Sequence, residues 1–395
     1  MESFVQMQAP SIESAWRFVW DRLFYEKTNL IYDHVLDDLS YFPTRAEAES
    51  AFPNPCGYGT GMEDSMINCS SMLLACIGRL KREKHDGAEA LAHRLVKGIL
   101  DCQATAKSHG FLPRSVIPTD GVSHYIDSSR DQYTLCVYAM HVYLSTELAT
   151  DEERKRIATM LVSFAERAER NVTPENGYDL LREDGLPTLC TVMWGEKLGN
   201  HEVMRLPMLY LAAWEVSGDG HWLTLYRDIR DEAIERSLPM TGRYWHLYTL
   251  QQMQMSVRLC YDLDPDAFAR KRCGEVLCAV ADYILALIPQ TRAKLQARDD
   301  YNAPFLSFHE VPLAPRKGTV AGGYPNLAPV RDEYDSFFIL QDAINTVNAV
   351  NLCPDRALTA DATRLFAEAL EKIDFKTHQT SVPVQVLEAF YGMRI

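Results

Sequence analysis

The sequence has no apolar run long enough to cross a membrane, and its basic residues form no dense cluster. The formal net charge is −14, and the densest basic stretch, residues 79–84, is interrupted by Glu83. A chain this acidic repels nucleic acid. Residues 1–12 show no charged segment followed by an apolar one, which predicts the absence of a signal peptide. We therefore expect a cytoplasmic protein with neither a membrane nor a nucleic-acid partner.

Metal and cofactor signatures are also missing. The ten cysteines show neither CxxC nor Cys/His spacing, and most lie in apolar stretches, as buried free thiols do in a reducing compartment. No second histidine follows the His201-Glu202 pair at the zinc-binding spacing, and no Gly-x-Ser-x-Gly motif is present. The glycine-rich stretch 57–61 lacks both a preceding strand and the further glycine of a dinucleotide fingerprint. We therefore expect no metal and no cofactor.

Helical periodicity is the main signal that the sequence does contain. With 47% hydrophobic and 24% charged residues among 395, the chain has an ordinary globular composition and enough material for a large core. Strand signals are few and support at most short hairpins within loops, as at 188–193. Hydrophobic spacing and end signals predict about twelve helices, at residues 11–38, 62–82, 88–105, 130–148, 152–169, 201–217, 221–236, 246–261, 266–288, 336–350, 357–372 and 382–393.

The predicted helices alternate between two classes. Segment 152–169 is amphipathic, whereas 66–77 and 134–144 are apolar or small nearly all round and must be covered on most faces. The covered class follows the long loops, which span 54–62, 110–130, 176–200 and 303–335. Such alternation predicts one all-α domain over residues 1–395, an (α/α)6 toroid whose long loops share one end. An open solenoid is the alternative, but its repeats normally have a regular period.

The first candidate site lies in the glycine-rich loop 54–66. Tyr58 offers an aromatic face there, and the glycines let the backbone approach a ligand closely. Thr60 and Glu63 have the spacing of a capping box, so one interpretation gives Glu63 a structural role. Asp64 has no capping role in this interpretation. Either stabilisation by the helix dipole or catalysis explains the presence of an aspartate at this position. Glu63 and Asp64 are therefore candidate catalytic carboxylates.

The second candidate site opens another covered helix, at residues 128–134. Ser128 or Ser129 can cap this helix. Arg130, Asp131 and Gln132 are polar side chains at the start of a segment whose pattern otherwise indicates burial. Burying polar groups costs free energy unless they face a wet cavity or a ligand. This favours a catalytic role for Asp131 and substrate-binding roles for Arg130 and Gln132.

The remaining candidates lie in the other long loops. Each is weak alone, because a loop arginine is usually solvated and a loop tryptophan often covers the core. Together they predict a binding-site opening lined by carboxylates, aromatic rings and guanidinium groups. Such a lining suits an anionic sugar such as a uronate. Glu333 is a further candidate catalytic carboxylate, and the other candidate binding residues are Arg114, Trp194, His201, Arg205, Tyr244, His246 and Tyr324.

Paired carboxylates indicate a reaction class. In glycoside hydrolysis one carboxyl group protonates the leaving oxygen, and the other activates water or attacks directly. If Asp64 and Asp131 begin adjacent inner helices, an axis spacing of about 8–10 Å permits the separation of about 6.5–9.5 Å that inverting enzymes use. We therefore expect inversion, and leave open which group is the acid.

Three strings in the first half of the chain carry a family resemblance. Residues 54–65 (NPCGYGTGMEDS), 110–114 (GFLPR) and 128–134 (SSRDQYT) resemble six-hairpin glycosidase-like proteins and are most similar to glycoside hydrolase family 154. The similarity is clear over residues 54–185 and thinner beyond. It implies an (α/α)6 toroid and an exo-acting β-glucuronidase that releases terminal glucuronic acid from uronic-acid-containing oligosaccharides.

Other functions remain open from the sequence. An unsaturated glucuronyl hydrolase acting on lyase products shares the toroid and needs only one acid, and a uronate lyase or sugar epimerase is a third alternative. A non-catalytic helical scaffold is an alternative of another class. It predicts that Asp64 and Asp131 point at helix N-termini instead of into one cavity. The oligomeric state is also open, with a homo-oligomer among the alternatives.

Overall fold

The chain is mostly helical in the computed structural model, which describes residues 2–188, 190–240, 244, 246–318, 320–331 and 334–394. The all-α prediction is confirmed. Within these ranges the α-helices are α1 (Glu2–Phe18), α2 (Arg45–Glu49), α3 (Ser65–Leu80), α4 (Asp86–Ala104), α5 (Arg130–Leu144), α6 (Asp151–Asn171), α7 (Arg205–Ser217), α8 (Gly220–Ser237), α9 (Tyr248–Leu263), α10 (Ala267–Ala286), α11 (Ile288–Gln296), α12 (Tyr334–Asn351), α13 (Ala360–Glu371) and α14 (Val382–Gly392).

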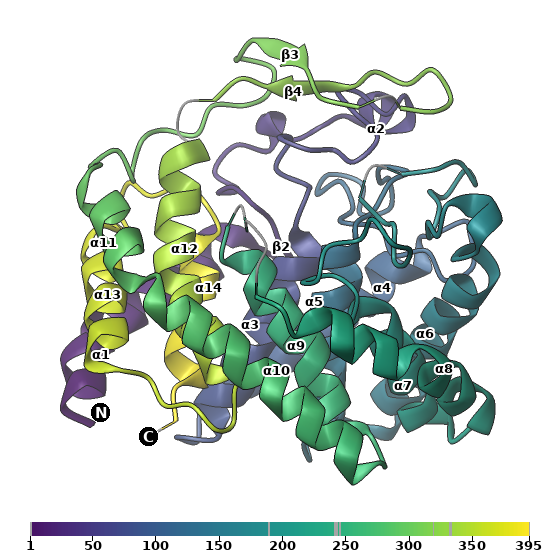
Figure 1. The fold of residues 1–395 in the computed structure, drawn as a ribbon. Helices are drawn as coiled ribbons and strands as arrows, with labels where there is room; N and C mark the ends of the chain where they lie inside the picture. The colour runs from purple at the N-terminus through teal and green to yellow at the C-terminus, as the bar shows by residue number, and fades with distance from the viewer. Residues whose placement is uncertain are drawn as a thin grey trace.

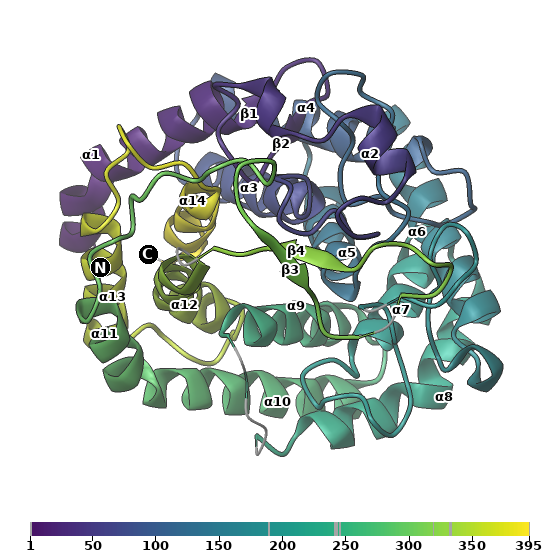
Figure 2. The same cartoon turned by 90° about the horizontal axis from the view of Figure 1, so that it is seen from above.

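Two short antiparallel strand pairs accompany the helices. Strands β1 (Phe24–Tyr25) and β2 (Leu30–Ile31) pair Phe24 with Ile31, near the N-terminus. Strands β3 (Leu313–Pro315) and β4 (Leu327–Pro329) pair Leu313 with Pro329. The β3–β4 hairpin lies beyond the helix ends in Figure 1 and passes over the central helices when seen from above in Figure 2.

The predicted helix at 11–38 is wrong beyond its first half. Helix α1 ends at Phe18, a π-helical turn occupies Val19–Leu23, and the chain then enters β1. The apolar residues that extended the prediction, such as Leu30 and Ile31, are fully buried in a strand, so tertiary packing overrides their helical spacing. The short helix α2 was not predicted, although Thr44 and Glu47 form a complete capping box at its start.

The helices pack in two groups. Helices α3, α5, α7, α9, α12 and α14 contact one another in that order, and α14 returns to contact α3. Each also contacts at least one helix from the second group, in the pairs α3–α4, α5–α6, α7–α8, α9–α10, α12–α13 and α14–α1. Figure 2 shows the first group around the centre and the second group outside it. Helices of the second group expose one face to solvent. In α13, for example, the buried residues, such as Ala362, Leu365 and Phe366, recur at helical spacing along a single face.

Helices α10 and α11 meet at a bend of 42°. Taken together, they have the length and apolar composition expected of a broken membrane span. In the described part of the chain, no helix meets both criteria by itself.

The contact between α3 and α14 brings the start of the central group against its end, and Gly78 lies in this contact. A Cβ atom at Gly78 would lie 2.6 Å from the carbonyl oxygen of Tyr391 and 2.9 Å from its Cβ. Both distances are shorter than van der Waals contact, and the first involves backbone that cannot rotate away. The two helices can approach this closely because position 78 has no side chain.

We predict that Gly78→Ala lowers the free energy of unfolding by about 1–3 kcal/mol, the usual cost of overpacking a core. The better helix propensity of alanine offsets only part of this cost. Gly220→Ala is the matched control, because no atom lies within 4 Å of a Cβ there. Denaturant unfolding of both variants measures the difference. Equal stability of Gly78→Ala and the parent protein would contradict the close α3–α14 contact.

Candidate active site

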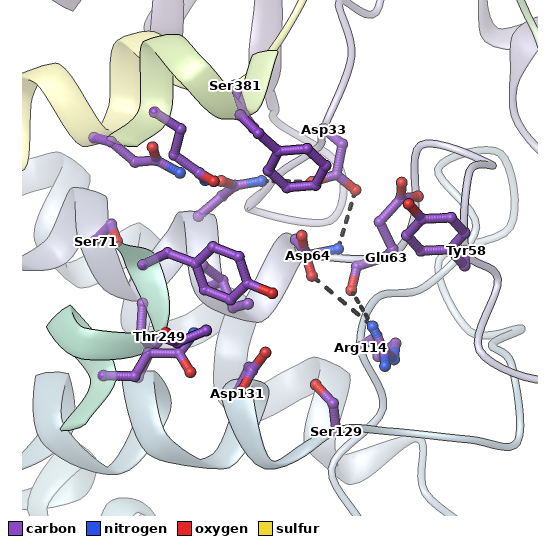
Figure 3. A pocket seen from close by; sticks show the side chains of 18 of the residues that line it. Asp33, Tyr58, Glu63, Asp64, Ser71, Arg114, Ser129, Asp131, Thr249 and Ser381 are labelled. Atoms are coloured by element: carbon purple, nitrogen blue, oxygen red, sulfur yellow. Dashed lines mark hydrogen bonds and ion pairs between the residues drawn. The ribbon is translucent and has the colours of Figure 1, made fainter. Parts of the chain in front are cut away.

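A cavity of about 420 Å³ opens at the end of the helices where the long loops gather. All six central helices contribute residues to it, and all of these except Asn345 of α12 lie in the N-terminal half of their helix. A volume of this size is in the range of small-molecule sites, about 300–1,000 Å³. Figure 3 shows part of the lining. Eight predicted site residues line the cavity: Tyr58, Glu63, Asp64, Arg114, Arg130, Asp131, His201 and Arg205.

Glu63 holds the glycine-rich loop together. Its carboxylate accepts the backbone N–H groups of Gly59 (3.1 Å) and Gly61 (2.9 Å). Both glycines have positive φ, which turns their amides toward one oxygen pair. The capping-box interpretation of Thr60 and Glu63 is therefore wrong: α3 begins later, at Ser65, and the Thr60 hydroxyl donates to the Gly57 carbonyl. Burial raises the pKa of Glu63 to about 7, and the charge of Asp64 adds to the shift.

Asp64 precedes α3 and presents its side chain to the cavity. The side chain makes no capping hydrogen bond, although Asp64 occupies the N-cap position. One oxygen accepts from Gln132 Nε2 at 2.9 Å and lies 3.9 Å from Arg114 Nη1. Removal from bulk water raises the pKa of Asp64, the nearby charge of Asp131 adds to this, and Arg114 opposes it. Even so, 43% of the side-chain surface is accessible, so Asp64 can contact a ligand.

Asp131 lies on α5 across the cavity from Asp64, as Figure 3 shows. It forms an ion pair with Arg205, the first residue of α7, whose guanidinium is almost fully buried. Burial alone would raise the pKa of Asp131, but Arg205 and Arg130 outweigh burial and hold the pKa below its ordinary value. Two carboxyl groups on one cavity are thus shifted in opposite directions.

Most of the arginines at the cavity are already engaged. Arg114 donates to the carbonyl oxygens of Glu63 and Ser128, both at 3.2 Å. Arg130 is paired with Glu202, and Arg205 with Asp131. Arg316, which directly follows β3, is different. Its guanidinium carbon lies 4.3 Å from the centre of the Tyr58 ring, and its Nη1 has no hydrogen-bond partner among the described residues.

Several predicted binding residues are not part of the cavity lining. Gln132 lies behind Asp64 and also donates to the Glu63 carbonyl (2.8 Å). The Trp194 ring stacks under Arg236, and the Tyr324 ring under Arg182. Tyr244 and His246 also lie outside the lining: Tyr244 bonds Asn200, and His246 stacks on Phe338. These side chains pack on neighbouring loops and helices, which their composition could not reveal. Glu333 lies outside the described residues.

Other lining residues were not predicted from the sequence. Asp33 is buried beside Asp64, where its carboxylate accepts the Asp64 backbone N–H (3.0 Å) and Asn68 Nδ2 (2.8 Å). Burial raises the pKa of Asp33 well above its ordinary value. Asp131 was predicted because it is a polar side chain in a helix that is otherwise buried. The same signal could have identified six amide side chains of the lining: Asn68, Gln251, Gln252, Gln341, Asn345 and Gln385. No local signal marked Asp33 or Arg316.

The thiols of Cys56 and Cys190 also line the cavity. All ten cysteines are free; eight are buried, and Cys190 and Cys278 are half-buried. A hydrogen bond with Cys56 lowers the pKa of Cys190 to about 7, with Arg114 contributing. Burial instead raises the pKa of Cys278 to about 11. Cys190 is therefore the half-buried thiol that ionises near neutral pH.

Comparisons with family models, curated proteins and solved structures find no match to this chain. In the ranges that the structure describes, no group of three or more His, Cys, Asp or Glu side chains is arranged to hold a metal ion. The cavity offers carboxyl groups of opposite pKa shift, guanidinium groups, aromatic rings and amides.

We predict that iodoacetamide at pH 7.5 alkylates Cys190 before Cys278. The reactive species is the thiolate, which predominates for a thiol with a pKa of about 7 and is scarce for one with a pKa of about 11. Peptide mass spectrometry over a time course measures both sites, and Cys56→Ala, which removes the hydrogen-bond donor, is expected to slow the labelling of Cys190. Equal labelling rates at the two thiols would show that the Cys56–Cys190 hydrogen bond does not form.

Proposed function

We propose that this protein is a glycoside hydrolase that releases a terminal glucuronic acid from an oligosaccharide, on an (α/α)6 toroid. The observation that supports this most is the pair Asp64 and Asp131. Both line one cavity, and their surroundings shift their pKa values in opposite directions. Carboxyl groups whose pKa values are driven apart are the usual acid and base of glycoside hydrolysis. A scaffold with no chemistry has no need of such a pair facing a cavity.

We assign the two roles from the opposite shifts. Asp64, with the raised pKa, holds a proton and donates it to the glycosidic oxygen as the bond from that oxygen to the anomeric carbon breaks. Asp131 stays ionised and accepts a proton from the water that adds to the anomeric carbon. The products are the free uronic acid and an alcohol, and proton exchange with solvent restores both carboxyl groups. Glu63 and Asp33 hold the Asp64 backbone and its loop in place.

Helix contacts support both the toroid and inversion. The central helices contact one another in a closed order, and each contacts an outer helix. Asp64 and Asp131 begin α3 and α5, which are in contact. Axes of packed helices lie about 8–10 Å apart, which agrees with a carboxyl separation of about 6.5–9.5 Å and room for one water between the groups.

Arg316 supports an anionic sugar as the substrate. In the described part of the chain, Arg114, Arg130 and Arg205 bond carboxylates or backbone carbonyls through Nη atoms and leave a buried Nε without a partner, whereas the buried atom without a partner in Arg316 is Nη1. Arg316 extends from the end of β3, and the β3–β4 hairpin crosses above the central helices (Figure 2). A guanidinium fork on an aromatic ring is well suited to bind a sugar carboxylate. We assign the recognition of the uronate carboxylate to Arg316.

A second candidate is an unsaturated glucuronyl hydrolase. The ion pair between Asp131 and Arg205 favours it, because a carboxylate held by a buried guanidinium is a weaker base. Protonation of a vinyl ether needs only one acid, and Asp64 can supply it. An unsaturated uronyl disaccharide distinguishes the two: the glucuronidase leaves it intact and cleaves 4-nitrophenyl β-glucuronide, whereas the unsaturated hydrolase does the reverse.

We predict that Asp64→Asn and Asp131→Asn each lower kcat on 4-nitrophenyl β-glucuronide by about 10²–10⁴-fold, because each removes one proton-transfer group. The parent kcat/KM falls at low pH as Asp131 gains a proton and at high pH as Asp64 loses one. Residual activity of Asp131→Asn should therefore lack the acid limb.

Asp335→Asn is the matched control for these variants. Asp335 also lies in the first turn of a central helix, but its side chain is 83% exposed and lies 3.7 Å from Arg298, outside the cavity. This variant should keep the parent rate. Full activity of both Asp64→Asn and Asp131→Asn would rule out the assigned roles.

We predict that Arg316→Met raises KM for the glucuronide about 10–100-fold, because it removes a charge-assisted hydrogen bond worth about 1.5–3 kcal/mol. Any slow activity on the corresponding neutral glucoside should stay the same. Lys317→Met is the control, because this substitution removes the same charge from the adjacent position, where the side chain is exposed. Steady-state kinetics on the two substrates give the ratio. An equal loss on both would mean that Arg316 has only a structural role.

A further inference from the structure

The cavity has a second half in which the lining is uncharged. Figure 3 shows Ser71, Thr249 and Ser381 on the side away from Glu63 and Arg114. Four amides from three central helices extend this half: Gln252 of α9, Gln341 and Asn345 of α12, and Gln385 of α14. All four are buried, with exposed fractions of 3%, 8%, 0% and 6% respectively. Amides are rarely gathered in this way in the interior of a helical domain.

These amides have unused hydrogen-bonding capacity. Gln252, Gln341 and Gln385 each have a side-chain oxygen with no partner among the described residues, and Asn345 has a nitrogen in the same state. Buried polar atoms without partners cost free energy, so a set of four on one cavity calls for an occupant. Hydroxyl groups fit best, because each both donates and accepts and can satisfy either end of an amide.

The occupant of this half carries no charge. Within the described chain, the residues that α9, α12 and α14 contribute to the lining include no Lys, Arg, Asp or Glu. Beneath them lies Glu388, which accepts from Gln251 Nε2 at 2.9 Å. Burial raises the pKa of this carboxyl group to about 7, and neither its protonated nor its ionised form offers an anion a counter-charge. A carboxylate or sulfate placed here would lose its hydration without gaining a counter-charge.

We propose that this half of the cavity binds a neutral, hydroxyl-rich sugar ring, the neighbour of the uronate in the substrate. Phe337 and Phe338 also line the cavity and offer apolar faces for the C–H groups of such a ring. The inference rests on the proposed function for the bond that is cut. It limits the substrates to uronyl groups attached to neutral sugars, and it excludes polyuronates and sulfated chains.

The first experiment compares a glucuronyl-hexose disaccharide with a diglucuronide of the same linkage, using the parent protein. We expect kcat/KM to be at least about tenfold higher for the neutral disaccharide, since one unpaired buried charge costs more than the roughly 1.4 kcal/mol of a tenfold factor. Equal or faster cleavage of the diglucuronide overturns the proposal.

Variants then test the amides themselves. In Gln341→Met and Gln385→Met, the ratio of kcat/KM on the neutral disaccharide to that on 4-nitrophenyl β-glucuronide should fall about three- to tenfold, mainly through KM. The nitrophenyl group fills the same half without using its amides. Gln254→Met is the matched control, because this buried glutamine of α9 donates to the Leu277 and Ala349 carbonyls and does not line the cavity. An unchanged ratio in both variants contradicts the proposal.

A binding measurement separates this inference from the proposed function. Calorimetry with glucose, galactose and glucuronate as probes needs no turnover. Heat of binding with a neutral sugar, lost in Gln341→Met, supports the amide site even if neither glucuronide is cleaved, in which case only the proposed reaction fails. If no neutral sugar binds the parent protein at millimolar concentration and glucuronate does, the amide site is wrong. If Gln341→Met does not fold, the proposal is tested by Gln385→Met and by the parent protein's preference for the neutral disaccharide over the diglucuronide.

Discussion

The site depends on offsetting the negative charge of several carboxyl groups held close together. Asp33, Glu63, Asp64 and Asp131 all line one cavity in a chain whose net charge is already −14. Their surroundings reduce the repulsion among these carboxyl groups in two ways. Arg205 keeps Asp131 ionised, whereas burial keeps protons on Glu63 and Asp33 to higher pH and so removes charge. Without both, four anions could not share so small a volume.

The helical arrangement makes this offset possible. The N-terminal parts of all six central helices reach the cavity, and a helix N-terminus carries a partial positive charge that favours an anion. Asp64 and Asp131 both lie at such ends. The glycine-rich loop adds two backbone N–H groups on Glu63. The groups that stabilise the acidic cluster are therefore part of the backbone as well as side chains.

The cavity is divided by charge. One side carries the carboxyl groups and the arginines, and the other carries amides and hydroxyls from α9, α12 and α14. Such a division gives an extended ligand a direction, because its charged end and its neutral end bind different walls. Under the proposed function, an acidic protein binds an anionic sugar because the attraction is local, at Arg316, although the overall field has the opposite sign.

The sequence by itself determined most of the helices, though not α2, α11 or the true end of α1, together with their covered and amphipathic classes and the positions of Asp64 and Asp131 at helix starts, because periodicity and end signals are local. The capping-box interpretation, one of two that the sequence left open for Glu63, is wrong, since the choice between helix-start amides and the Gly59 and Gly61 amides depends on where the loop packs. Only the tertiary structure brought Arg316 onto Tyr58 and Asp33 under Asp64. It also decided the pKa shifts, because these arise from burial and from charges far apart in the chain.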